Sequence, residues 1–131
     1  MKKILLIALA FFATQFAIAQ APLSAIKSMP INYDDAEVKP EFPGGHNEFM
    51  KFIGSNFKTP EVEGLSGVIK ISFVVETTGK ITGIKVINDI GSGTGEEAMR
   101  VIAKSPNWSP GEQDGKPVRV TYQLPITIRG Y

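Results

Sequence analysis

The sequence predicts an α+β domain, a two-layer sandwich in which a three-stranded antiparallel sheet packs against two helices. Three stretches, 67–75, 81–88 and 118–128, have the alternation or the β-branched composition typical of strands. Two further stretches, 47–57 and 94–105, place apolar side chains at helical spacing. A sheet with one buried face needs a cover, and two amphipathic helices provide it.

The first helix is predicted over 47–57, after a short strand expected at 36–42. Pro43-Gly44-Gly45 separates the two, because proline cannot continue a ladder and glycine allows a sharp reversal. Thr59-Pro60 ends the helix, since the residue before proline is disfavoured in the helical region. The predicted buried face consists of Phe49, Phe52, Ile53 and Phe57.

A hairpin and a second helix follow. Strand 67–75 is predicted to turn at Thr77-Thr78-Gly79-Lys80 and return as strand 81–88. The helix from Thr94 begins with the pattern of a capping box, in which Thr94 and Glu97 satisfy each other's backbone N–H groups. Pro106 ends this helix.

The last strand, 118–128, is apolar at every second position and contains Pro125. Proline has no N–H, so within sheets it is confined mainly to edge strands. If the even-numbered residues pair with an inner strand, the open edge consists of the backbones of Arg119, Thr121, Gln123 and Thr127, with a gap at Pro125. Two interpretations remain open: this edge receives a partner strand, or its proline and arginines prevent edge-to-edge aggregation.

The N-terminus has the layout of a secretory signal. Lys2 and Lys3 precede an apolar run over 4–18, and Ala17-Ile18-Ala19 has small residues at the positions that a signal peptidase reads. We expect a signal peptide at 1–19, a flexible leader or weak first strand at 20–36, and one domain at 37–131. The expected location is the periplasm. The alternative is an uncleaved inner-membrane anchor, which would need about 20 apolar residues.

Composition argues against several classes of function. Without Lys2 and Lys3, 12 of the 14 basic residues remain against 13 acidic residues, so nucleic-acid binding is not expected. With no cysteine and with His46 as the single histidine, we expect no metal site, no catalytic triad, no cofactor and no small-molecule substrate. The glycines at 91, 93 and 95 do not form a dinucleotide-binding loop, because Glu96 stands where its last glycine would be. The protein is not expected to be an enzyme.

Several motifs occur in a fixed order: Lys39-Pro40-Glu41-Phe42-Pro43-Gly44-Gly45, Gly67 through Val75, Glu96 through Ile102, Trp108-Ser109-Pro110-Gly111, and Gly115-Lys116-Pro117-Val118 through Leu124-Pro125-Ile126. In this order they resemble the C-terminal domains of TonB energy transducers, especially of the Bacteroidetes type. The resemblance covers about 37–131 and implies the TonB/TolA C-terminal type of sandwich. It also implies that the last strand receives the "TonB box" peptide of an outer-membrane transporter as an added strand, at Arg119, Thr121, Gln123, Pro125 and Thr127.

The chain departs from the family pattern in two respects. Thr59-Pro60 stands where the family usually has Tyr-Pro, and the connection from Pro60 to Gly67 is shorter than is typical.

Energy transducers also keep an uncleaved membrane helix and a long proline-rich arm, which the expected signal peptide and short leader do not provide. We therefore expect peptide binding without energy transduction. The alternative is a structural envelope protein that forms a homodimer through the same sheet edge.

Overall fold

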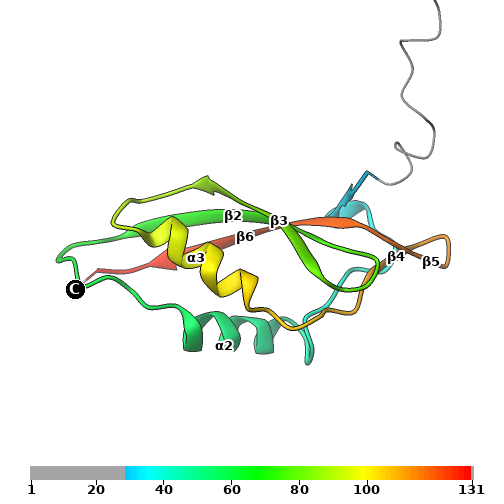
Figure 1. Ribbon diagram of the computed structural model, residues 1–131, viewed down its shortest axis with the longest axis horizontal. Helices are drawn as coiled ribbons and strands as arrows, with labels where there is room; N and C mark the ends of the chain where they lie inside the picture. The colour runs from blue at the N-terminus through cyan, green and yellow to red at the C-terminus, as the bar shows by residue number, and fades with distance from the viewer. Residues whose placement is uncertain (1–28, 131) are drawn as a thin grey trace, which may run out of the picture.

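The computed structural model describes residues 29–130, so the signal peptide expected at 1–19 lies outside the described residues. Two helices, one 3₁₀ turn and six strands make up the described chain (Figure 1). In order they are β1 (Ile31–Asn32), η3 (Tyr33–Asp35), α2 (His46–Asn56), β2 (Gly67–Val75), β3 (Ile81–Asn88), α3 (Thr94–Ala103), β4 (Gly111–Gln113), β5 (Lys116–Val118) and β6 (Val120–Ile128).

The main sheet has four strands in the order β1-β6-β2-β3. The expected antiparallel core of β2, β3 and β6 is confirmed, but the prediction of three strands was wrong. The fourth strand, β1, pairs in parallel with the beginning of β6 through Ile31 and Asn32. A two-residue strand is too short to show a hydrophobic period, so the sequence could not give its position or its pairing. β1 and η3 lie within the segment 20–36, for which a flexible leader or a weak first strand was expected.

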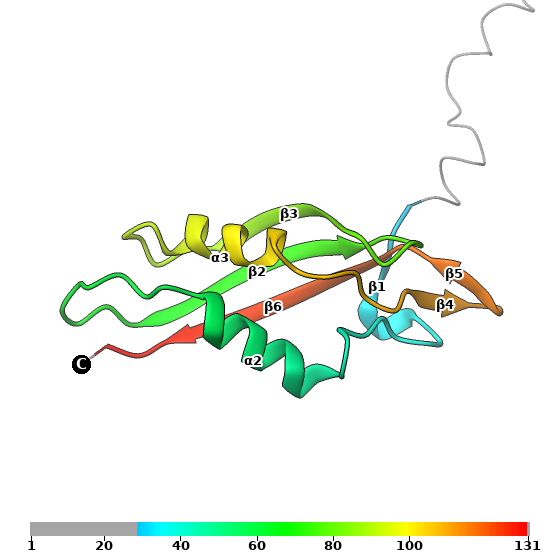
Figure 2. The same cartoon turned by 60° about the horizontal axis from the view of Figure 1, so that its bottom comes forward.

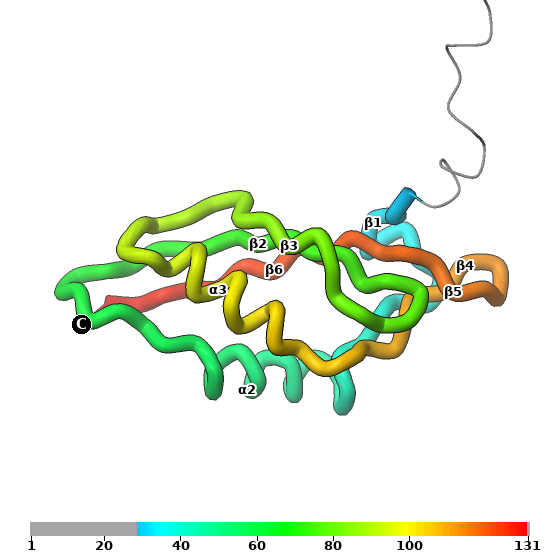
Figure 3. The backbone as a smooth tube through the Cα atoms, in the orientation of Figure 1, coloured from blue at the N-terminus to red at the C-terminus, as the bar shows by residue number. Residues whose placement is uncertain are grey.

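The two layers are a sheet and a pair of helices on one of its faces (Figures 1 and 3). Helix α3 packs on β2 and β3, whereas α2 runs along the side of the sheet on which β6 lies (Figure 2). The two-layer α+β class is therefore confirmed. One hydrophobic core joins the two helices, β2, β6 and the loop residues Phe42 and Trp108. Its buried members are Phe42, Phe49, Ile53, Ile69, Ile71, Phe73, Val75, Ala98, Val101, Ile102, Trp108, Leu124, Ile126 and Ile128.

Aromatic rings fill one end of this core. Trp108 is 5% exposed and lies 4.8 Å from Phe49 and 5.6 Å from Phe73, measured between ring centroids. Its indole Nε1–H donates to the Ser105 hydroxyl at 2.8 Å, so the polar atom of the ring is satisfied. The Trp108 backbone N–H donates to the Gly79 carbonyl at 2.8 Å, which ties the β2–β3 turn to the core.

The predicted capping box of the second helix does not form. The N-cap position is Gly93, and the Thr94 hydroxyl donates to the Asp89 carboxylate at 2.9 Å and to the Gly91 carbonyl. Asp89 also accepts from the Gly95 N–H at 3.2 Å, so a residue just after β3 supplies the anion at the start of α3. The Gly91 N–H also donates to the Asp89 carboxylate, at 3.0 Å. Together these hydrogen bonds lower the pKa of Asp89, and the bond from the Gly91 N–H contributes most.

The strand expected at 118–128 is divided at Arg119. β5 ends at Val118 and pairs with β4 in a separate two-stranded sheet, and β6 begins at Val120. The short strand expected at 36–42 is present only as two isolated bridges, from Val38 to Glu112 and from Glu41 to Ser109. These bridges attach β4, and Ser109 shortly before it, to the segment that leads into α2.

Candidate functional site

The two sides of the β2–β3–β6 core differ in regularity. The pairing of β3 with β2 is irregular at two places, and Gly83 within β3 has a φ of 60°. Bulges of this kind twist an edge strand and interfere with the addition of another strand. In contrast, β6 pairs with β2 without interruption from Val120 to Ile128. The β6 side therefore has the more regular backbone.

β1 covers only the first part of this edge. The Ile31 N–H donates to the Arg119 carbonyl at 2.9 Å, and Asn32 lies opposite Thr121. The chain then turns into η3 and leaves the sheet plane (Figure 2). Among the described residues, no strand pairs with the outer edge of β6 from Tyr122 to Ile128.

Two hydrogen bonds establish which backbone groups point outward. The Arg119 carbonyl faces β1, which places odd-numbered residues on the outer side because successive residues of a strand alternate. On β2, the Val68 carbonyl accepts from the Asn88 side chain at 2.6 Å and so faces β3. Thr127, its register partner on β6, accordingly faces away from β2. The open edge thus consists of the N–H and C=O groups of Gln123 and Thr127 and the C=O group of Pro125.

The five predicted site residues are divided into two groups by β1. Arg119 and Thr121 lie where β1 already occupies the edge, and the Arg119 side chain makes a bidentate ion pair with Glu76. Gln123, Pro125 and Thr127 are exposed and border the open part. Pro125 faces outward, so its missing N–H removes no hydrogen bond to β2.

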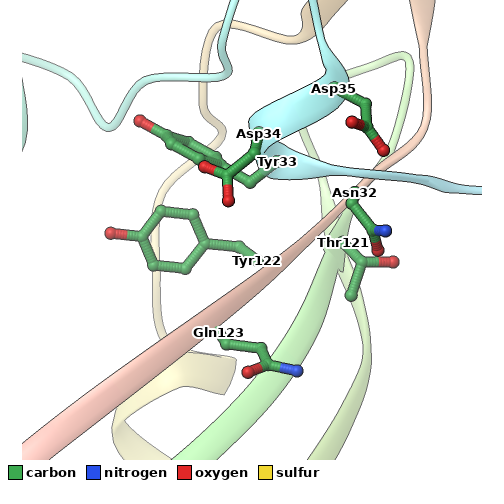
Figure 4. A pocket seen from close by; sticks show the side chains of 7 residues that line it. All are labelled: Asn32, Tyr33, Asp34, Asp35, Thr121, Tyr122 and Gln123. Carbon is green, nitrogen blue, oxygen red and sulfur yellow. The ribbon is translucent and has the colours of Figure 1, made fainter.

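A polar cavity of about 550 Å³ lies where β1 and η3 cross the edge (Figure 4). The rings of Tyr33 and Tyr122 meet edge to face with centroids 5.0 Å apart. Burial raises the pKa of the Tyr122 hydroxyl, which is the direction expected for a partly desolvated phenol. The lining of the cavity includes two acidic residues, Asp34 and Asp35, and no basic residue.

Beside the open part of β6, a groove of about 400 Å³ separates the strand from α2. None of its lining residues carries a charge; they are Met50, Ile53, Gly54, Phe57, Thr59, Leu124, Pro125, Ile126, Thr127 and Ile128. Neither Met50 nor Gly54 was predicted to be part of a site. Met50, Gly54 and Phe57 recur at spacings of four and three, which places them on one side of the predicted helix, but this spacing does not show that a groove lies beside it.

A family model for the C-terminal region of the Gram-negative bacterial TonB protein matches residues 61–128, which is more than half of the chain. The chain belongs to the TonB C-terminal family. The match extends from the segment before β2 to the last residue of β6, so it includes the whole open edge of this TonB C-terminal domain. It confirms the family that the motifs resembled.

The family indicates the cellular location of such domains and the kind of protein that they contact. TonB C-terminal domains are periplasmic protein-interaction domains of Gram-negative bacteria that contact outer-membrane transporters. No match was found among curated proteins or among solved structures. Neither helix within residues 29–130 is long and apolar enough to span a membrane. The same residues contain no group of three acidic or histidine side chains placed to hold a metal ion.

Proposed function

We propose that this TonB C-terminal domain binds an extended peptide, the TonB box of an outer-membrane transporter, by adding it as a strand to the outer edge of β6. The observation that carries the proposal is the contrast between the edges. β3 is irregular at two places, whereas β6 is regular, and among the described residues no strand pairs with its outer edge beyond Thr121. Strand addition uses main-chain hydrogen bonds and therefore needs such an edge.

The free part of the edge limits the length of the peptide. From Tyr122 to Ile128 it spans about 20 Å, enough for about six or seven extended residues. The protein would donate from Gln123 and Thr127 and accept at Gln123, Pro125 and Thr127. One peptide carbonyl opposite Pro125 receives no backbone hydrogen bond, which weakens the interaction without preventing it.

The cellular setting forms part of the proposal. Export by a cleaved signal peptide at 1–19 would place the domain in the periplasm, where a transporter's periplasmic peptide is accessible. Mass spectrometry of the protein purified from the envelope fraction tests this step. A mature N-terminus at Gln20 supports export with cleavage, whereas an intact Met1 or Lys2 terminus contradicts it.

The test of binding is a titration of ¹⁵N-labelled protein with a TonB-box peptide, followed by backbone amide shifts. We expect the largest shifts at Gln123 and Thr127 and small shifts along β3. A peptide N-methylated at every second residue, on the side that faces β6, is the matched control. It keeps the side chains but loses the N–H groups that would donate to β6. No shift at Gln123 and Thr127 at millimolar peptide would contradict the proposal.

A homodimer formed by two β6 edges is the rival use of the same backbone groups. Sedimentation velocity over a range of protein concentrations separates the two, since the peptide-binding proposal expects a monomer at micromolar concentration. A stable dimer that the peptide does not dissociate would favour the structural alternative.

A further inference from the structure

We propose that the groove between α2 and β6 selects the side chains of the added strand, so that the preferred ligand is a peptide with uncharged apolar residues at every second position. The inference rests on the proposed function and deepens it, because strand addition alone is indifferent to side chains. It assigns a specificity role to Met50 and Gly54 on α2 and to Phe57, which directly follows the helix; all three line the groove.

β1 shows which way the side chains of an added strand point. Ile31 lies opposite Val120, whose side chain is fully buried on the helix side of the sheet. Residues opposite each other in a sheet have side chains on the same face, so Ile31 also points to the helix side. A ligand strand further along the edge must follow the same rule. Its residues opposite Leu124, Ile126 and Ile128 face α2, whether the strand runs parallel or antiparallel.

The lining of the groove decides which side chains are accepted there. Leu124, Ile126 and Ile128 form one wall, and Met50, Ile53 and Phe57 belong to the α2 side. A charged side chain entering this space loses water and finds no charged partner among the lining residues, which is unfavourable. An apolar side chain removes apolar surface from water and is favoured. The intervening ligand residues point to the opposite, solvent-exposed face of the sheet and are not selected in this way.

Gly54 provides a means of closing the groove without damaging the fold. It is a helical residue with no atom within 4 Å of where a Cβ would stand, and it lines the groove. Glycine in a helix is less favourable than leucine, so Gly54→Leu should stabilise α2 while its side chain takes up groove space. Ser55→Leu is the matched control, because Ser55 lines a shallow depression on another side of α2.

The experiment compares two fluorescently labelled hexapeptides of identical composition. One alternates Val and Thr, and the other has three Val followed by three Thr. Fluorescence anisotropy gives the affinities, and amide shifts at Gln123 and Thr127 report binding at the edge. We expect the alternating peptide to bind about ten-fold more tightly to the native protein and to the Ser55→Leu variant. Gly54→Leu should abolish the difference and raise the thermal midpoint.

Three results would overturn the inference, and they are distinguishable. Equal affinities, with edge amide shifts from both peptides, would remove the groove's role and leave strand addition intact. Retention of the ten-fold preference by a folded Gly54→Leu variant would likewise remove the groove's role. Absence of edge shifts with these peptides and with the TonB-box peptide would overturn strand addition as well.

Discussion

Arg119 and Glu76 form a bidentate ion pair at the start of the edge strand. The Arg119 Nε lies 2.8 Å from Glu76 Oε1, and its Nη2 lies 3.0 Å from Oε2. Glu76 follows β2 and Arg119 precedes β6, so the pair continues the β2–β6 register by one step. Thr82 on β3 also donates its hydroxyl to Glu76. The Glu76 carboxylate therefore connects Arg119, a predicted site residue, to Thr82 on β3.

Glu76→Gln should lower the free energy of unfolding at neutral pH by less than about 1 kcal/mol, because both side chains are partly exposed. The hydrogen bond from Arg119 lowers the pKa of Glu76, so this stabilisation is present above the usual glutamate pKa and falls as the carboxylate is protonated. Urea denaturation measures the difference. Peptide affinity should remain unchanged, and a large loss of affinity in a folded Glu76→Gln variant would show that the pair also controls the open edge.

Glu97 should make stability depend on pH in the acid range. Its carboxylate accepts two hydrogen bonds from Arg100 and one from the Lys58 N–H at 2.7 Å, and the pKa is lowered to about 2, chiefly by Arg100. Because the folded pKa lies below the unfolded value, the stabilisation is complete above about pH 4.5 and is lost between there and about pH 2.

Urea denaturation of Glu97→Gln at several pH values checks this expectation. The variant should be less stable than the native protein at pH 7, and the difference should shrink as the pH falls towards 2. The adjacent Glu96→Gln is the control, since Glu96 is exposed and should show a small effect throughout. A difference in stability between Glu97→Gln and the native protein that is independent of pH would contradict the assignment.

Gly79→Ala should be strongly destabilising. Gly79 has a φ of 86°, and an added Cβ would overlap the Trp108 backbone carbonyl. Gly115→Ala separates the effect of the positive φ from the effect of the overlap with Trp108. Gly115 also has a positive φ, of 75°, but no atom lies within 4 Å of its Cβ position. Thermal unfolding should show a modest loss for Gly115→Ala, on the order of 1 kcal/mol, and a larger one for Gly79→Ala. Equal losses would mean that the turn can move away from Trp108.

The sequence was sufficient for the elements with a long hydrophobic period. The alternation in 67–75 and the helical spacing in 47–57 correspond closely to β2 and α2, because each of these elements has one buried face. It was insufficient where long-range contacts decide the structure. β1 is two residues long and depends on the edge of β6. The start of α3 uses Asp89, which lies before the loop, so the local pattern of Thr94 and Glu97 was misleading.

The candidate edge was predictable from Pro125 and from the alternation of 118–128, which identified an edge strand and the parity of its outward residues. The occupation of Arg119 and Thr121 by β1 was not predictable, because no local pattern marks Ile31 and Asn32 as a strand. The groove could not be identified from sequence either. It depends on the separation of α2 from β6, which the packing of Phe49 and Ile53 into the core determines.

Amide hydrogen exchange at the β6 edge tests the central claim most directly. In the free monomer, the Gln123 and Thr127 N–H groups should exchange rapidly, while those of Leu124 and Ile126, which face β2, should be protected. Saturation with a TonB-box peptide should slow exchange at Gln123 and Thr127 at least ten-fold and change Leu124 and Ile126 little. If Gln123 and Thr127 remain unprotected in the saturated complex, the peptide does not add to β6 as a strand.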